Sequence, residues 1–167
     1  MLEGILKGKR GLIMGVANSK SIAWGIAESC SLAGAEIAFT YQSDSLKKRL
    51  IPLANQIGSK ILLECDVGNP NSLDTVFSEL QKKWGSIDFL VHAIGFSDKS
   101  ELRGKYLNTS QENFANTLAI STFSFTAVAQ RAEKIMLNGG SILTLTYYGS
   151  EKVLPHYNVM GVAKAAL

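Results

Sequence analysis

The feature that most constrains this chain is an alternation, repeated five times, of a short apolar run and a longer segment with apolar residues at helical spacing. Parallel strands covered on both faces read as nearly continuous apolar runs, and helices connect them. With 46% hydrophobic residues among 167, the chain can bury one sizeable core. We therefore predict an α/β fold with a doubly wound parallel sheet in three layers, α/β/α, forming a single domain.

Individual residues mark where these elements begin and end. Ser21 is expected to cap the first helix and Ile22 to lie on its apolar stripe, while Asn69 caps the third helix and Gly85 ends it. Pro52 is expected to make the second helix irregular or short. Strands are expected at residues 10–15, 35–41, 61–67, 87–94 and 141–147. Helices are expected at residues 21–33, 46–57, 69–84, 110–137 and from 157 onward, with a long loop after residue 94.

Charge and cysteine usage exclude several classes of function. A net charge of +3 is too small and too evenly spread to indicate nucleic-acid binding. Cys30 and Cys65 stand alone, which favours reduced thiols and a cytoplasmic location over a disulfide or metal site. The first ten residues lack the apolar core of a signal peptide, and no run approaches the roughly 20 apolar residues that cross a membrane. We expect the fold to be longer than this chain, because the final helix reaches Leu167 without a stop signal.

The residues that follow the strands are the candidates for ligand binding, since Rossmann-type sheets bind ligands at the carboxyl ends of their strands. The small-residue turn at residues 15–22 leads into a helix start that would suit a diphosphate, although an ordinary strand-to-helix connection explains it equally well. Gln42 could bind an adenosine ribose or be a solvated turn residue. Asp66 could meet an adenine or cap the next turn, with Val67 beside it.

The sharpest chemical signal is a pair of residues, Tyr157 and Lys164, in YNVMGVAK. Their spacing of seven places both side chains on one face of a helix. A nearby ammonium group is expected to lower the phenol pKa and let the tyrosine act as an acid near neutral pH. Chance placement of the two residues is the alternative. Tyr147 is expected to close the fifth strand close by.

Four segments together resemble a known family. They are GVANSKSIAWGIA, AFTYQ, VHAIGF and LTLTYYGSEKVLPHYNVMGVAKAAL. The chain resembles the short-chain dehydrogenase/reductase superfamily and, within it, the bacterial NADH-dependent enoyl-[acyl-carrier-protein] reductases. The last segment is the most specific, because ordinary superfamily members have a serine near the end of strand five and a YxxxK pair. Here Tyr147 stands in place of that serine, and six residues separate Tyr157 from Lys164.

The resemblance implies NADH as cofactor, a choice that the missing arginine after the second strand also favours. It assigns cofactor contacts from the diphosphate turn to the nicotinamide-side ribose. These residues are Gly15, Ser21, Ile22, Gln42, Asp66, Val67, Ile94 and Lys164.

The resemblance also implies a reaction: hydride transfer from NADH to the β-carbon of a trans-2-enoyl thioester in fatty-acid synthesis. Tyr147, Tyr157 and Lys164 would be catalytic, with Tyr157 hydrogen-bonded to the thioester carbonyl and Lys164 holding the ribose. Ser97 would contact the substrate through its backbone. The implied partner is acyl carrier protein, and the implied assembly is a homotetramer formed partly through the helix at Tyr157.

Two other functions stay open at this point. A reductase of 3-oxoacyl thioesters or small ketones is the first, although tyrosine at position 147 argues against it. A non-catalytic NAD-binding fragment is the second, because family members continue well beyond the last helix with a segment that covers the acyl chain. If the 167 residues are all there is, we expect weak or no turnover.

Overall fold

The structure is a computed structural model that describes residues 4–167. Its residues group into two compact units, which are described separately. The first contains the chain up to Ala93 together with Ala129–Leu143, and the second contains Ile94–Val128 and Thr144–Leu167.

A five-stranded sheet with the strand order β3-β2-β1-β4-β5 organises the first unit. The pairs β1–β2, β1–β4 and β2–β3 are parallel. Because the chain adds strands on one side of β1 and then on the other, the order reverses between β1 and β4. The doubly wound α/β fold is confirmed. The strands are β1 (Arg10–Met14), β2 (Glu36–Tyr41), β3 (Ile61–Glu64), β4 (Phe89–His92) and β5 (Ser141–Thr144).

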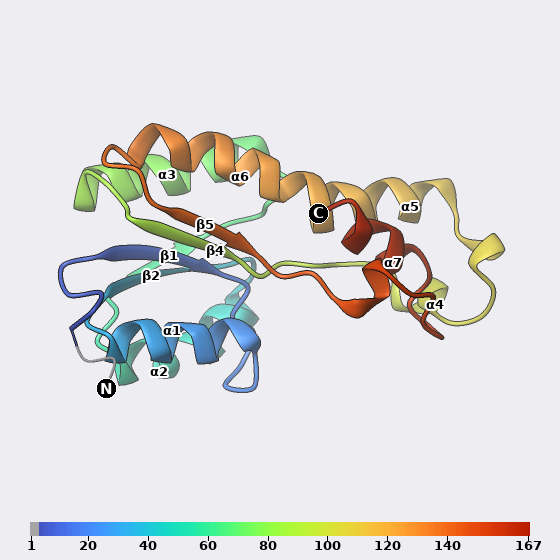
Figure 1. Cartoon of the computed structure of the whole chain (residues 1–167), viewed down its shortest axis with the longest axis horizontal. Coiled ribbons are helices and arrows are strands. Elements are labelled where there is room, and N and C mark those ends of the chain that lie inside the picture. Colours follow the sequence, from blue (N-terminus) through green and yellow to red (C-terminus); the bar gives the residue numbers. More distant parts are fainter. Residues whose placement is uncertain (1–3) are drawn as a thin grey trace. The chain divides into compact units, whose positions relative to one another are not determined.

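Helices cover both faces of this sheet and complete the three layers (Figure 1). On one face α1 (Ile22–Leu32) and α2 (Asp44–Gln56) bury Trp24, Phe39 and Leu50. On the other face lie α3 (Pro70–Trp84) and the end of α6 (Ser124–Ala132), joined by an ion pair of 2.7 Å between Arg131 Nε and Asp74 Oδ1. Side chains alternate between these faces along each strand, so β1 and β2 contribute to both cores.

Several expectations about the first unit need correction. The second helix runs unbroken for 13 residues with Pro52 inside it, because Leu50, Leu53 and Ala54 hold its inner face in the core. Ile22 is 71% exposed rather than part of the buried stripe, which Ala23, Trp24 and Ala27 form instead. Asn69 and Gly85 bound α3 as expected, and His92 is fully buried in β4, as expected of a packed strand residue.

The second unit is mostly helical. The expected loop after β4 contains the short helix α4 (Lys99–Leu102) and the turn η1 (Tyr106–Asn108). The expected long helix is interrupted: α5 (Gln111–Leu118) continues as the π-helical segment η2 (Ala119–Phe123), then α6, and it ends in η3 (Glu133–Ile135) within the first unit. The chain ends in η4 (Tyr148–Ser150) and α7 (Asn158–Ala165).

Residues 4–167 contain neither a membrane-spanning helix nor a cluster of metal-binding side chains. None of the described helices is long and apolar enough to span a membrane. The described His, Cys, Asp and Glu side chains form no group of three that could hold a metal ion. Cys30 and Cys65 are free thiols, and burial together with the Asp66 charge raises the pKa of Cys65 to about 11.

Glycine at position 15 is required where the strand order reverses. Gly15 follows β1 with φ of 96°, and a Cβ there would overlap the carbonyl oxygen of Ala93, which follows β4. β1 and β4 can therefore end side by side only because this residue lacks a side chain.

Replacing Gly15 by alanine should lower the free energy of unfolding by at least about 2 kcal/mol, from backbone strain and overlap together. Gly25→Ala is the matched control, because a Cβ at Gly25 points into open space among the described residues of α1. The control should gain about 0.5–1 kcal/mol from helix propensity. Urea unfolding of both variants measures the difference, and equal effects would contradict the required glycine.

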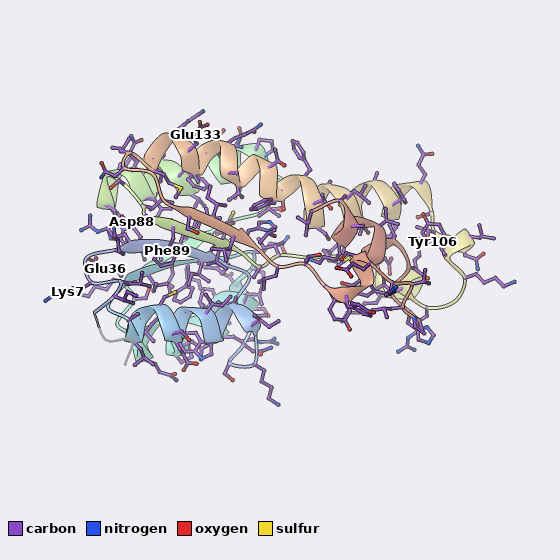
Figure 2. The ribbon with its side chains drawn as sticks, viewed as in Figure 1. Lys7, Glu36, Asp88, Phe89, Tyr106 and Glu133 are labelled. Carbon is purple, nitrogen blue, oxygen red and sulfur yellow. The ribbon has the colours of Figure 1, made fainter. Side chains whose placement is uncertain are left out.

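Asp88 joins the starts of β1 and β4 at the edge where the strands begin (Figure 2). Its carboxylate accepts hydrogen bonds from Lys9 Nζ at 2.9 Å and from the Arg10 amide at 2.9 Å. The bond from Lys9 contributes most to a pKa below the usual 3.8.

A lowered pKa means that ionised Asp88 stabilises the fold above the unfolded-state pKa and that this contribution disappears as pH falls through the folded-state pKa. Asp88→Asn should therefore cost about 1 kcal/mol at pH 7, and its difference from the wild type should shrink below pH of about 4. Glu36→Gln is the control, because its ion pair with Arg10 is long, at 3.6 Å, and Glu36 is 57% exposed. Urea midpoints across pH 2.5–7, in steps of about 0.5, test this; a difference that does not depend on pH would disprove it.

Candidate active site

The turn between β1 and α1 is built around the Ser21 hydroxyl. Ser21 Oγ accepts hydrogen bonds of 3.1 Å from the amides of Ala17 and Asn18, so it shapes the turn rather than capping the helix as expected. The amides of Ile22 and Ala23 precede the first bond within α1, which Trp24 donates to the Ser21 carbonyl at 2.9 Å. Free amides at a helix start suit an anionic group.

Ile22 and Gln42, two of the predicted cofactor contacts, are both exposed in the first unit. Ile22 lies at the start of α1 and exposes most of its side chain, and Gln42 is exposed directly after β2. Nearby, Lys47 Nζ lies 5.3 Å from the centre of the Tyr41 ring, where cation–π attraction holds it.

Asp66 caps the turn after β3, which was one of the two roles expected of it. Its Oδ1 atom accepts a 2.9 Å bond from the Gly68 amide, and its own amide donates to Ser72 Oγ at 2.9 Å. Both bonds shape the turn between β3 and α3. Asp66 is exposed and Val67 half-buried, and a contact of either residue with adenine stays a prediction.

In the second unit, Tyr147 and Tyr157 form an aromatic pair. Their ring centres lie 5.1 Å apart in an edge-to-face arrangement. A Cβ on Gly149 would overlap the Tyr157 ring, so this glycine leaves the space that the ring occupies. The expectation that Tyr147 closes strand β5 is wrong, because the strand ends at Thr144, three residues before Tyr147. Tyr157 immediately precedes α7.

Lys164 is fixed by the segment that follows β5. Its Nζ atom donates to the carbonyl of Leu145 at 2.8 Å, and its own carbonyl accepts from Thr146 Oγ1 at 2.8 Å. An ammonium group carries three hydrogens, so two remain for a ligand. A Cβ on Gly95 would lie 3.8 Å from Nζ, which places the lysine beside a stretch of backbone without a side chain. Ile94, just before it, is half-buried.

The protonation of the pair differs from the expectation. Burial, followed by the neighbouring Tyr147, raises the pKa of the Tyr157 phenol above its usual 10.0. Burial lowers the pKa of Lys164 below 10.5. The expectation that Lys164 makes Tyr157 more acidic is therefore wrong, because the ammonium is directed at the Leu145 carbonyl and the buried phenolate is poorly solvated. Tyr157 therefore stays protonated at neutral pH, and its hydroxyl is able to donate a hydrogen bond.

Ser97 is held in a buried polar cluster on α5. Its hydroxyl accepts from Thr117 Oγ1 at 2.9 Å and contacts the Asn113 amide, while Asn113 Oδ1 accepts from the Asp98 amide at 3.0 Å. The Ser97 hydroxyl is thus bonded to other residues of the protein. A contact of the Ser97 backbone with substrate stays a prediction.

The sequence analysis missed three residues of this region: Asn113, Thr117 and Ser121. Ser121 Oγ accepts from the Phe96 amide and donates to the Phe96 carbonyl, both at 2.9 Å. All three are buried and recur every four residues, so they form a polar stripe along one helix. That regular polar spacing within an otherwise helical pattern was the available signal.

Known proteins resemble this chain over nearly its whole length. A family model described as enoyl-(acyl carrier protein) reductase matches residues 15–167. The enoyl-[acyl-carrier-protein] reductase [NADH] 1 of Rhizobium meliloti is 65% identical over 99% of this chain, and that of Rickettsia bellii is 54% identical over 100%. A crystal structure of the Anaplasma phagocytophilum reductase in complex with NAD has a TM-score of 0.96 and 56% identity over 99% of the chain. The chain spans 61% to 64% of the lengths of these relatives. It belongs to the enoyl-(acyl carrier protein) reductase family.

Proposed function

We propose that this chain acts in the NADH-dependent reduction of trans-2-enoyl thioesters carried by acyl carrier protein, a step of fatty-acid synthesis. The observation that carries the proposal is the protonated Tyr157 phenol, packed against Tyr147 directly before the helix that holds Lys164. Family membership, and the activity that the relatives' names state, support it.

Several residues of the first unit, taken by itself, fit the adenosine and diphosphate parts of an NADH cofactor. Gly15 lets the chain turn directly after β1, where a Cβ would overlap the Ala93 carbonyl, and the first amides of α1 suit a diphosphate. Gln42, Asp66 and Val67 would bind the adenosine side. In the second unit, Ile94 would line the nicotinamide side, and the two unused hydrogens of Lys164 would bind ribose hydroxyls. When bound, NADH supplies the hydride that reduces the β-carbon.

Tyr157 would act on the charge that this reaction creates. As the β-carbon is reduced, negative charge builds on the thioester carbonyl oxygen, and a donor aimed at that oxygen stabilises the transition state more than the ground state. The raised pKa keeps the phenol proton on Tyr157 for this purpose. The edge-to-face packing of Tyr147 would limit the movement of the Tyr157 ring. The Ser97 backbone would position the substrate.

The remaining predictions belong to the same proposal. Residues 1–167 would serve as one NAD-binding domain, and the protein would be a cytoplasmic homotetramer whose partner is acyl carrier protein. The free thiols of Cys30 and Cys65 support a reducing compartment. The competing functions are a 3-oxoacyl or carbonyl reductase and a non-catalytic NAD-binding protein.

NADH oxidation by the purified chain, with a trans-2-enoyl thioester and separately with a 3-oxoacyl thioester, distinguishes these functions. We expect turnover of the enoyl substrate alone, weak if the 167 residues are the whole protein, and a fall of about 100-fold in kcat for Tyr157→Phe, since one charge-stabilising donor is removed. Tyr148→Phe is the matched control, because this neighbouring tyrosine is 57% exposed, and it should retain wild-type turnover.

Each other outcome has a defined meaning. Turnover of the 3-oxoacyl substrate alone would favour the carbonyl reductase, and NADH binding without turnover of either substrate would favour the non-catalytic protein. Unchanged enoyl reduction by Tyr157→Phe would remove Tyr157 from the mechanism.

Lys164 should make cofactor binding depend on pH. Burial lowers the pKa of Lys164 below 10.5, so this ammonium loses its proton at a lower pH than an exposed lysine does. NADH affinity of the wild type should therefore weaken on the alkaline side before pH 10.5 is reached, whereas Lys164→Met should bind more weakly at pH 7 and lack this decline. Fluorescence titrations with NADH between about pH 7 and 10.5 measure both profiles. Matching profiles for the two proteins would rule out a role for the ammonium group.

A further inference from the structure

The two residues that flank Tyr157 have backbone conformations that non-glycine residues seldom adopt. His156 has a φ of 61° and Asn158 a φ of 32°. Such conformations persist where the surrounding contacts determine them, and they are frequent at functional sites. The contacts that hold Asn158 therefore bear directly on where Tyr157 lies.

The Asn158 side chain is bonded to a loop at residues 101–104, made of the end of α4 and the residues that follow it. Its Nδ2 atom donates to the carbonyl oxygens of Glu101 at 3.0 Å and Leu102 at 3.2 Å, with Gly104 at 3.5 Å as a longer third contact. All three acceptors are backbone carbonyl oxygens, so these bonds require a particular backbone conformation of the loop. These bonds attach the start of α7 to residues 101–104.

That loop is itself anchored, which gives the attachment a fixed base. The Glu101 carboxylate accepts bonds of 2.8 Å from the Ser110 amide and from the Ser110 hydroxyl, and one of 3.2 Å from Asn113 Nδ2. The two Ser110 bonds are the main reason that the pKa of Glu101 lies below its usual 4.5, so the carboxylate stays ionised at neutral pH. The anchor therefore leads from α5 through Glu101 to Asn158.

The Tyr157 side chain has little freedom on its other sides. Its ring packs edge-to-face against Tyr147 and fills the space beside Gly149. Its backbone carbonyl accepts a 2.9 Å bond from the Met160 amide in the first turn of α7. The direction of the ring thus depends on where this first turn begins, and Asn158 fixes that point.

We propose that Asn158 is a positioning residue for Tyr157: its amide clamps the start of α7 to residues 101–104 and thereby holds the phenol where the substrate carbonyl would lie. The part of this inference that concerns substrate rests on the proposed function. The placement of the ring does not, and it can be measured without turnover.

The first measurement follows Tyr157 directly, using protein labelled with 13C at the tyrosine Cζ atoms. The Tyr157 signal is assigned by its absence in Tyr157→Phe, and its pH titration gives the pKa of the phenol. Asn158→Gly tolerates the positive φ but loses the amide donors. Because the released ring becomes better solvated, its signal should move and its pKa should fall toward the usual value of about 10.

A matched control separates the clamp from the general cost of adding a glycine. Asn116→Gly makes the same substitution at an exposed position of α5 and should leave the Tyr157 signal and pKa as in the wild type. Asn158→Ser is a second test variant, because its shorter side chain also loses the bonds to the loop. If both Asn158 variants fail to fold, or if both fold with the Tyr157 signal unchanged, the proposal is overturned.

The second measurement uses turnover of the enoyl thioester in a double-mutant cycle. Asn158→Gly should lower kcat at least tenfold while changing NADH affinity less than twofold, and it should have little further effect in the Tyr157→Phe background, because residues that act as a unit are not additive. If Asn158 had only a structural role, Asn158→Gly would lower kcat by the same factor in the wild type and in the Tyr157→Phe background. That result would overturn the proposal. If the wild type shows no turnover, the proposed function fails, and the labelled-tyrosine measurement still decides the placement.

Discussion

The pairing of β1 with strands on both of its sides is the constraint on which the rest of the first unit depends. β1 hydrogen-bonds to β2 along one edge and to β4 along the other, and Leu12, Ile13 and Met14 are fully buried. Any side chain at Gly15 would push the ends of β1 and β4 apart. The same glycine therefore sets the sheet geometry at the point where the strand order reverses, the place where open α/β sheets commonly bind ligands.

The second unit depends on polar contacts rather than on a sheet. The stripe of Asn113, Thr117 and Ser121 binds residues 96–98, and Glu101 binds the start of α5. Buried polar groups of this kind specify one arrangement, since a displaced partner would leave an unpaired donor or acceptor. Lys164 is held by a polar contact with the Leu145 carbonyl, and Asn158, which follows Tyr157, is bonded to the Glu101 carbonyl. The two tyrosines pack against each other through their rings.

Much of the fold could be predicted because its cause is local. Continuous apolar runs identified all five strands, and Asn69 and Gly85 identified the ends of α3. The errors arose where tertiary contacts outweigh local preference: the buried face of α2 keeps the helix intact through Pro52, and Ser21 bonds to the preceding turn instead of capping α1. Two further features were not predicted from the sequence: the long helix is interrupted at η2, and β5 ends before Tyr147.

The sequence by itself determined the α/β class, the identity of the candidate residues and, through the spacing of Tyr157 and Lys164 and the surrounding motifs, the family. These follow from periodicity and residue type, which depend only on neighbours along the chain. The tertiary structure alone decided the protonation of Tyr157 and the clamp formed by Asn158. Both depend on burial and on partners distant in sequence, because the solvation of a phenol and the acceptors of an amide exist only once the chain has folded.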